Sequence, residues 1–64
     1  MLDGDIIRKL RETRGLITYT FAKAVGISQS MVSMMERGLR VPRIEILKRV
    51  ANYLGCTVDF LLKK

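Results

Sequence analysis

The stretch AKAVGISQSMVSMME, residues 22–36, is the most informative about the fold of this 64-residue chain. Ala22 is small enough to let two helices cross closely. Gly26 can adopt the positive φ that a tight turn needs, and Val32 can fill the gap from the following helix. A small residue, a glycine and a β-branched residue at these spacings predict two short helices set at a steep angle, a helix-turn-helix over about residues 18–37.

Apolar residues recur at helical spacing on both sides of this stretch, and they predict five helices in one all-α domain spanning residues 1–64. Residues 1–4 are expected to be a frayed end and Lys63–Lys64 a polar one. The expected helices run from Asp3 or Gly4 to about Thr13, from Thr18 to Val25, from the cap Ser28 to near Arg37, from about Arg43 to Leu54, and for one short turn after the cap Thr57.

The last two helices carry their own apolar patterns. In the fourth helix the stripe expected to face the core is Ile44, Leu47, Val50, Ala51 and Leu54. In the last helix the expected apolar face is Phe60, Leu61 and Leu62.

The charge of the chain is strongly positive. Twelve Lys and Arg residues stand against six Asp and Glu residues, a formal net charge of +6. A basic surface attracts polyanions, although a solvated basic surface or a membrane surface fits the same sign. No stretch approaches the ~20 apolar residues that span a bilayer, and the acidic start MLDGDII is unlike a signal peptide. We therefore expect a cytoplasmic protein without a membrane partner.

The composition offers little for catalysis or metal binding. With no histidine and a single cysteine, Cys56, a zinc site and an internal disulfide are not expected. Cys56 has apolar neighbours and is interpreted as a small buried hydrophobe. Without paired carboxylates or a reactive-cysteine setting, we expect no enzyme activity, no cofactor and no small-molecule ligand.

The chain resembles the lambda-repressor-like helix-turn-helix family, which includes phage repressor and Cro proteins and restriction–modification controller proteins. The resemblance covers nearly the whole chain and implies a compact bundle of five helices, the count that periodicity also predicts. In family members the third helix lies in the DNA major groove. The segments that carry the likeness are Arg11-Glu12, Gly15-Leu16, GISQSMVSMMERG from Gly26 to Gly38, Pro42, Leu54-Gly55 and Val58–Leu62.

The resemblance implies which residues would read DNA bases. Gln29 opens the third helix and could bond adenine through two major-groove groups. Ser30 lies beside it, and Ser33 follows one turn later on the same face. Met34 could contact a thymine methyl group or could simply be exposed. The alternative for Gln29 and Ser33 is an ordinary solvated helix face.

The start of the second helix is an expected phosphate site, because free N–H groups point outward there. Family members usually have a glutamine at this position after a polar cap. Here Ile17 cannot cap, so the cap is expected to shift to Thr18, whose hydroxyl could still donate to a phosphate. Tyr19 and Thr20 stand where acids are common, which leaves this helix end less negative.

A second phosphate-binding group is implied around the exit from the recognition helix. Arg37, Arg40 and Arg43 resemble the family's other phosphate clamp, and Ser28 could touch a phosphate as well as cap its helix. The alternative for the arginines is a solvated basic loop.

Two further sets of residues are expected to stabilise the fold or to form a dimer surface. Arg11 and Glu36 are expected to form the partly buried ion pair that ties the first helix to the third in the family. A dimer surface is expected on the bundle itself, mainly on the last helix, although the same residues could be plain core. They are Tyr53, Val58, Leu61 and Leu62.

The sequence thus predicts a DNA-binding transcriptional regulator that binds double-stranded DNA as a homodimer on a palindromic operator. Two alternatives remain open. One is the antitoxin of a toxin–antitoxin pair, which usually carries an added toxin-binding segment. The other is a protein-interaction module on the same fold, using methionines as a soft surface.

Overall fold

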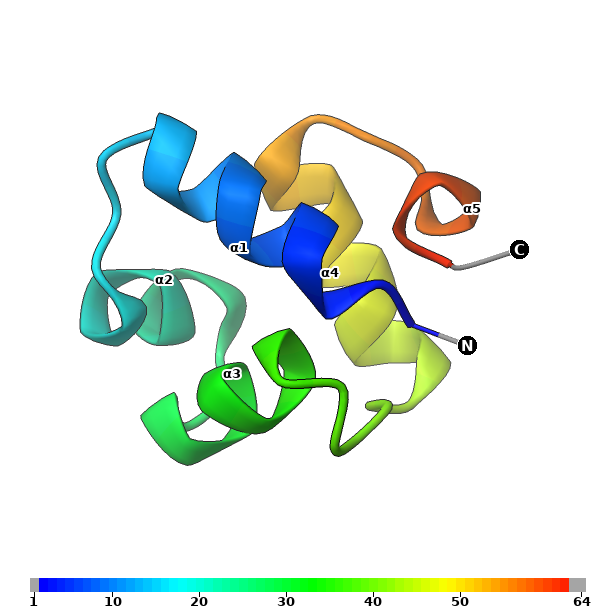
Figure 1. Ribbon diagram of the computed structural model, residues 1–64, viewed down its shortest axis with the longest axis horizontal. Coiled ribbons are helices and arrows are strands. Elements are labelled where there is room, and N and C mark those ends of the chain that lie inside the picture. The colour runs from blue at the N-terminus through cyan, green and yellow to red at the C-terminus, as the bar shows by residue number, and fades with distance from the viewer. Residues whose placement is uncertain (1, 63–64) are drawn as a thin grey trace.

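The computed structural model describes residues 2–62, and these form five helices, as predicted. The all-α fold class is confirmed. Met1 and the polar end expected at Lys63–Lys64 lie outside the described residues. The helices are α1 (Gly4–Thr13), α2 (Thr18–Val25), α3 (Gln29–Glu36), α4 (Ile44–Leu54) and α5 (Val58–Leu61) (Figure 1).

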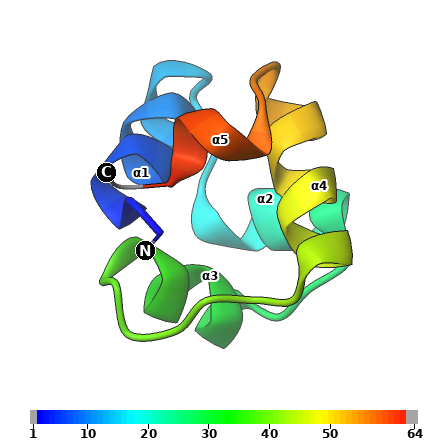
Figure 2. The same ribbon diagram turned by 90° about the vertical axis from the view of Figure 1, so that its right-hand side faces the viewer.

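The helices surround one core and leave α3 at an edge of the molecule. In both views α3 lies along the lower edge, whereas α1 lies in the upper part (Figures 1 and 2). Each helix contributes at least one buried apolar side chain to this core. One side of α3 is therefore packed against the core, and its other side faces solvent. The core consists of Leu2, Ile7, Phe21, Ala22, Val25, Val32, Met35, Leu47, Val50, Ala51, Leu54 and Leu61.

The N-terminus is anchored, so the frayed end expected from the sequence is wrong from residue 2 onward. Leu2 is buried and forms an isolated antiparallel bridge with Leu62. The N–H of Asp3 donates to the carbonyl of Leu61 at 2.7 Å. The Asp3 carboxylate caps α1 by accepting from two N–H groups of the first turn. No local pattern reveals this bridge, because it joins the two ends of the chain.

Two residues expected in the apolar faces of the last helices are exposed. Ile44, at the start of α4, lies in solvent, and Phe60 in α5 is 55% exposed. Ile46 packs against the core instead of Ile44. Conversely, Leu61 is fully buried, which corrects its assignment to a dimer surface. Because α5 has only four residues, its periodicity is too short to determine which side faces the core.

Cys56 is half-buried against the core rather than fully buried. Burial raises the pKa of the Cys56 thiol, and the positive charge of Arg14 acts in the opposite direction. A thiol with a raised pKa is protonated at neutral pH and is a poor nucleophile. Cys56 therefore serves as a small apolar group at the edge of the core.

Candidate nucleic-acid interface

A tight turn at Gly26 joins α2 to α3. Gly26 has φ of 76°, a left-handed conformation that side-chain-bearing residues rarely adopt. After the turn, the N–H of Ile27 donates to the carbonyl of Ala22 at 3.0 Å. Ala22 on α2 and Val32 on α3 are both buried, as the close packing of two helices requires. The turn thereby directs the start of α3 outward from the bundle.

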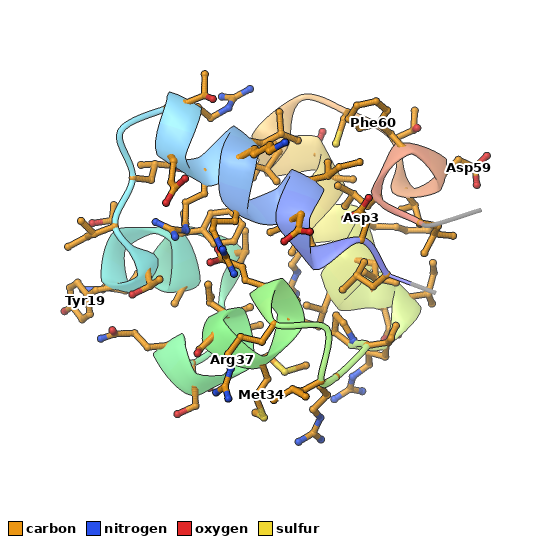
Figure 3. All side chains as sticks on the ribbon, in the orientation of Figure 1. Asp3, Tyr19, Met34, Arg37, Asp59 and Phe60 are labelled. Carbon is orange, nitrogen blue, oxygen red and sulfur yellow. The ribbon has the colours of Figure 1, made fainter. Side chains whose placement is uncertain are left out.

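The outward side of α3 carries the predicted base-reading residues. Ser28 caps the helix by accepting from the N–H of Met31 at 3.1 Å. Gln29, Ser30 and Ser33 are exposed, and Met34 is half-buried. Figure 3 shows Met34 pointing away from the bundle beneath α3. The four predicted residues thus lie on the accessible side of one helix, free to meet a partner.

The cap of α2 differs from the prediction. Thr18 is the first helical residue, and Ile17 occupies the cap position without making a side-chain hydrogen bond. The Thr18 hydroxyl instead donates to the Gln29 side-chain oxygen at 3.3 Å. This distance is long for a hydroxyl hydrogen bond, so the contact is weak. It nevertheless places the start of α2 beside Gln29, the first residue of α3.

Three of the predicted phosphate contacts line one hollow. Its volume is about 460 Å³, and it lies between the turn before α3 and the loop that leads into α4. Ser28, Arg40 and Arg43 are among its lining residues, together with the apolar side chains of Ile27 and Met31. Thr18 and Arg37 are not among them. The predicted phosphate contacts therefore do not form a single group.

An ion pair ties α3 to α1. The Arg11 Nε donates to Glu36 Oε2 at 2.6 Å, and its Nη2 donates to Oε1 at 3.1 Å. Arg11 also donates to the carbonyl of Leu16 at 2.7 Å. The bond to Glu36 raises the pKa of Arg11, although burial acts against it. Gly4 allows the close approach, because a Cβ there would overlap backbone oxygens at the end of α3.

The structure adds one pair that the sequence reasoning did not single out. The Nζ of Lys23 lies 5.3 Å from the ring centroid of Tyr19, within cation–π range. Both side chains are exposed on α2. Their spacing of four residues on a helix was the available signal, because such residues are neighbours on one face.

Other kinds of site receive no support from the residues that the structure describes. Between residues 2 and 62, no helix is long and apolar enough to cross a membrane. The same residues contain no group of three or more histidine, cysteine or acidic side chains placed to hold a metal ion.

A capped, outward-facing polar helix with cations on either side is typical of helix-turn-helix DNA-binding domains. The chain belongs to this helix-turn-helix family, in its lambda-repressor-like form, because the family model matches residues 7–61. This confirms the family and the five-helix architecture that the sequence motifs implied.

Individual relatives and structures agree with this assignment. The chain is 40% identical over 58 residues to the uncharacterized HTH-type transcriptional regulator YazB of Bacillus subtilis, covering 91% of this chain and 84% of YazB. The chain spans only 41% to 56% of the length of four further curated relatives that it matches.

Two solved structures show the likeness in three dimensions. The P22 c2 repressor, in complex with a synthetic operator, has a TM-score of 0.92 and 33% identity over 98% of this chain and 96% of the repressor chain. The biofilm regulator SinR in complex with DNA has a TM-score of 0.83 and 31% identity, with 94% and 97% covered.

Proposed function

We propose that the chain is a sequence-specific DNA-binding transcriptional regulator whose α3 enters the major groove. The observation that carries the proposal is the exposed polar face of α3, which starts at a capped N-terminus beside Thr18. Helices of this motif place their N-terminal residues at base edges. The net charge of +6 supplies the attraction to the phosphate backbone. The two relatives solved with operator or DNA support the same partner.

In this proposal Gln29, Ser30, Ser33 and Met34 contact bases, whereas other residues contact phosphates. The phosphate contacts are Thr18, Ser28, Arg37, Arg40 and Arg43. Arg37 and Met34 point in the same direction beneath α3 (Figure 3), which supports a shared DNA face. Ala22, Gly26 and Val32 hold the geometry of the motif, and the Arg11–Glu36 pair holds α3 against α1.

The proposal is tested by selecting binding sites from a random library of double-stranded DNA. We expect enrichment of one short motif, repeated as a palindrome if two copies bind together. Recovery of unrelated sequences at equal affinity would contradict sequence-specific recognition. The selected duplex then serves as the operator in the experiments below.

We expect Arg40→Ala to weaken binding to operator and to unrelated DNA by similar factors. A phosphate contact carries no sequence information, and its loss should reduce the slope of log K against log salt by about one. The measurement is a salt titration of binding by fluorescence anisotropy. Lys9→Ala is the control, because Lys9 is exposed on α1 and outside the proposed interface. A loss confined to the operator would assign Arg40 to base reading instead.

We further propose that two copies bind as a homodimer through apolar residues of α5 and the end of α4. Leu61 is excluded by its burial, which leaves Tyr53, Val58 and Leu62 of the residues that the sequence predicts for this surface. Phe60 joins them because it is 55% exposed. Its position at the upper right, away from Met34 and Arg37, supports a dimer surface separate from the DNA face (Figure 3).

We expect Phe60→Asp to abolish self-association without unfolding the protein, because this side chain is largely in solvent. The measurement is the mass by sedimentation at micromolar concentration, with and without operator. A dimer of wild type and a monomer of the variant are expected. A wild-type protein that stays monomeric in both conditions would contradict the dimer.

A further inference from the structure

The exposed face of α2 carries a lysine, Lys23 in the last turn, which lies over an aromatic ring and has no acidic partner among the described residues. Lys23 lies over the ring of Tyr19, with 5.3 Å between Nζ and the ring centroid. Both ion pairs found within residues 2–62 end at Glu36, so no carboxylate there neutralises the Lys23 ammonium. The first turn of α2 also contains no acid. This corner of the surface is therefore positive and unopposed.

The same corner lies beside the proposed recognition helix. Thr18 is the neighbour of Tyr19 in α2, and its hydroxyl contacts Gln29 on α3. In Figure 3 Tyr19 projects to the left from the start of α2, whereas Met34 and Arg37 point away from the bundle beneath α3. Asp3, Asp59 and Phe60 lie toward the opposite, upper right side. Tyr19 thus lies at the end of α2 that contacts α3, one residue from Thr18.

We propose that Lys23 contacts a DNA backbone phosphate and that the ring of Tyr19 positions its ammonium group for this contact. The inference rests on the proposed function and adds a contact to it on the α2 side of α3. The arginine loop, residues 37–43, lies on the other side of α3 (Figure 1). Lys23 would therefore contact the DNA backbone on one side of the major groove, and Arg40 and Arg43 would contact it on the other side.

The aromatic ring explains why this lysine, among several exposed ones, would contribute. A free lysine side chain loses much rotamer freedom when it binds, which offsets its attraction to a phosphate. A ring that already holds the ammonium reduces that loss. Because an ammonium has three donors, it can stay over the ring face and still donate to a phosphate oxygen. Tyr19 is a positioning residue in this arrangement, since it acts through Lys23.

The decisive variant is Lys23→Gln, tested on the selected operator and on an unrelated duplex. We expect affinity to fall about three- to tenfold for both, and the salt slope to fall by about one, since one phosphate contact is lost. Lys9→Gln removes an equal charge from α1 and should leave the slope near the wild-type value. Equal slopes in Lys23→Gln and Lys9→Gln would overturn the proposal, because the effect would then be one of net charge.

Two substitutions at Tyr19 separate positioning from direct contact. Tyr19→Phe keeps the ring face and should bind within about twofold of wild type. Tyr19→Ser removes the ring and should bind about two- to fivefold more weakly. If Tyr19→Phe were as weak as Tyr19→Ser, the hydroxyl would be responsible and the positioning role would be wrong. Both variants should melt like wild type, because Tyr19 is 51% exposed.

The experiment distinguishes this inference from the proposed function. If wild type recognises an operator through Gln29 while Lys23→Gln binds like wild type, only the Lys23 contact fails. If wild type shows no preference for any duplex, the proposed function fails first, and the Lys23 assignment fails with it.

Discussion

Arg11→Met is expected to remove most of the stability of this domain. The carboxylate of Glu36 is 6% exposed and receives two hydrogen bonds from Arg11, so the substitution leaves a buried charge without its close partner. Breaking a buried pair on one side typically costs about 3–5 kcal/mol. A chain of this size has only about 3–10 kcal/mol in total. The melting temperature, followed by circular dichroism, should fall by more than about 12 °C.

Two comparisons show whether the buried charge is the cause. Arg8 also approaches Glu36, at 3.8 Å, but its side chain is 44% exposed. Arg8→Met should therefore cost less than about 1 kcal/mol, because solvent screens that pair. The double variant Arg11→Met with Glu36→Met removes both charges and should regain most of the loss. If Arg11→Met melted within a few degrees of wild type, the pair would not be holding α1 to α3.

Gln29→Ala is expected to weaken operator binding by about 1–3 kcal/mol and to relax the preference at one base pair. Gln29 is exposed at the start of α3, and its only side-chain hydrogen bond within residues 2–62 is the weak one from Thr18. Its removal should therefore leave the fold unchanged. The measurement is a gel-shift competition between the operator and duplexes altered at each position. Binding to unrelated DNA should change little.

Thr18→Val provides a matched control for the same site. It removes the hydroxyl that contacts Gln29 and keeps a side chain of similar shape. A smaller loss than that of Gln29→Ala is expected, because the base reader itself remains. If Gln29→Ala bound the operator with unchanged affinity and preference, the assignment of α3 as the recognition helix would be wrong.

Most of the fold could be predicted because local signals agree along the chain. Gly26 ends α2 with a positive φ, and Ser28 caps α3 as its position indicated. The stripe from Leu47 to Leu54 is long enough for periodicity to identify its buried side. The Arg11–Glu36 pair came from the family resemblance, since 25 residues separate its members and no local pattern joins them.

The candidate site was predictable in part for the same reason. Exposure of Gln29, Ser30 and Ser33 follows from the burial of Val32 and Met35 on the other side of the same helix. The cap of α2 was missed, because Ile17 occupies the cap position even though isoleucine has no capping group, a placement that side-chain preference alone does not predict.

The helix count, the turn at Gly26 and the polar face of α3 could be predicted from local sequence, because each depends on residues close together in the chain. The bridge between Leu2 and Leu62, and the burial of Leu61 with exposure of Phe60, became known only from the packing of the folded chain. That packing also placed Thr18 against Gln29. These features depend on how distant segments pack, and the periodicity of a short segment carries no information about its neighbours in space.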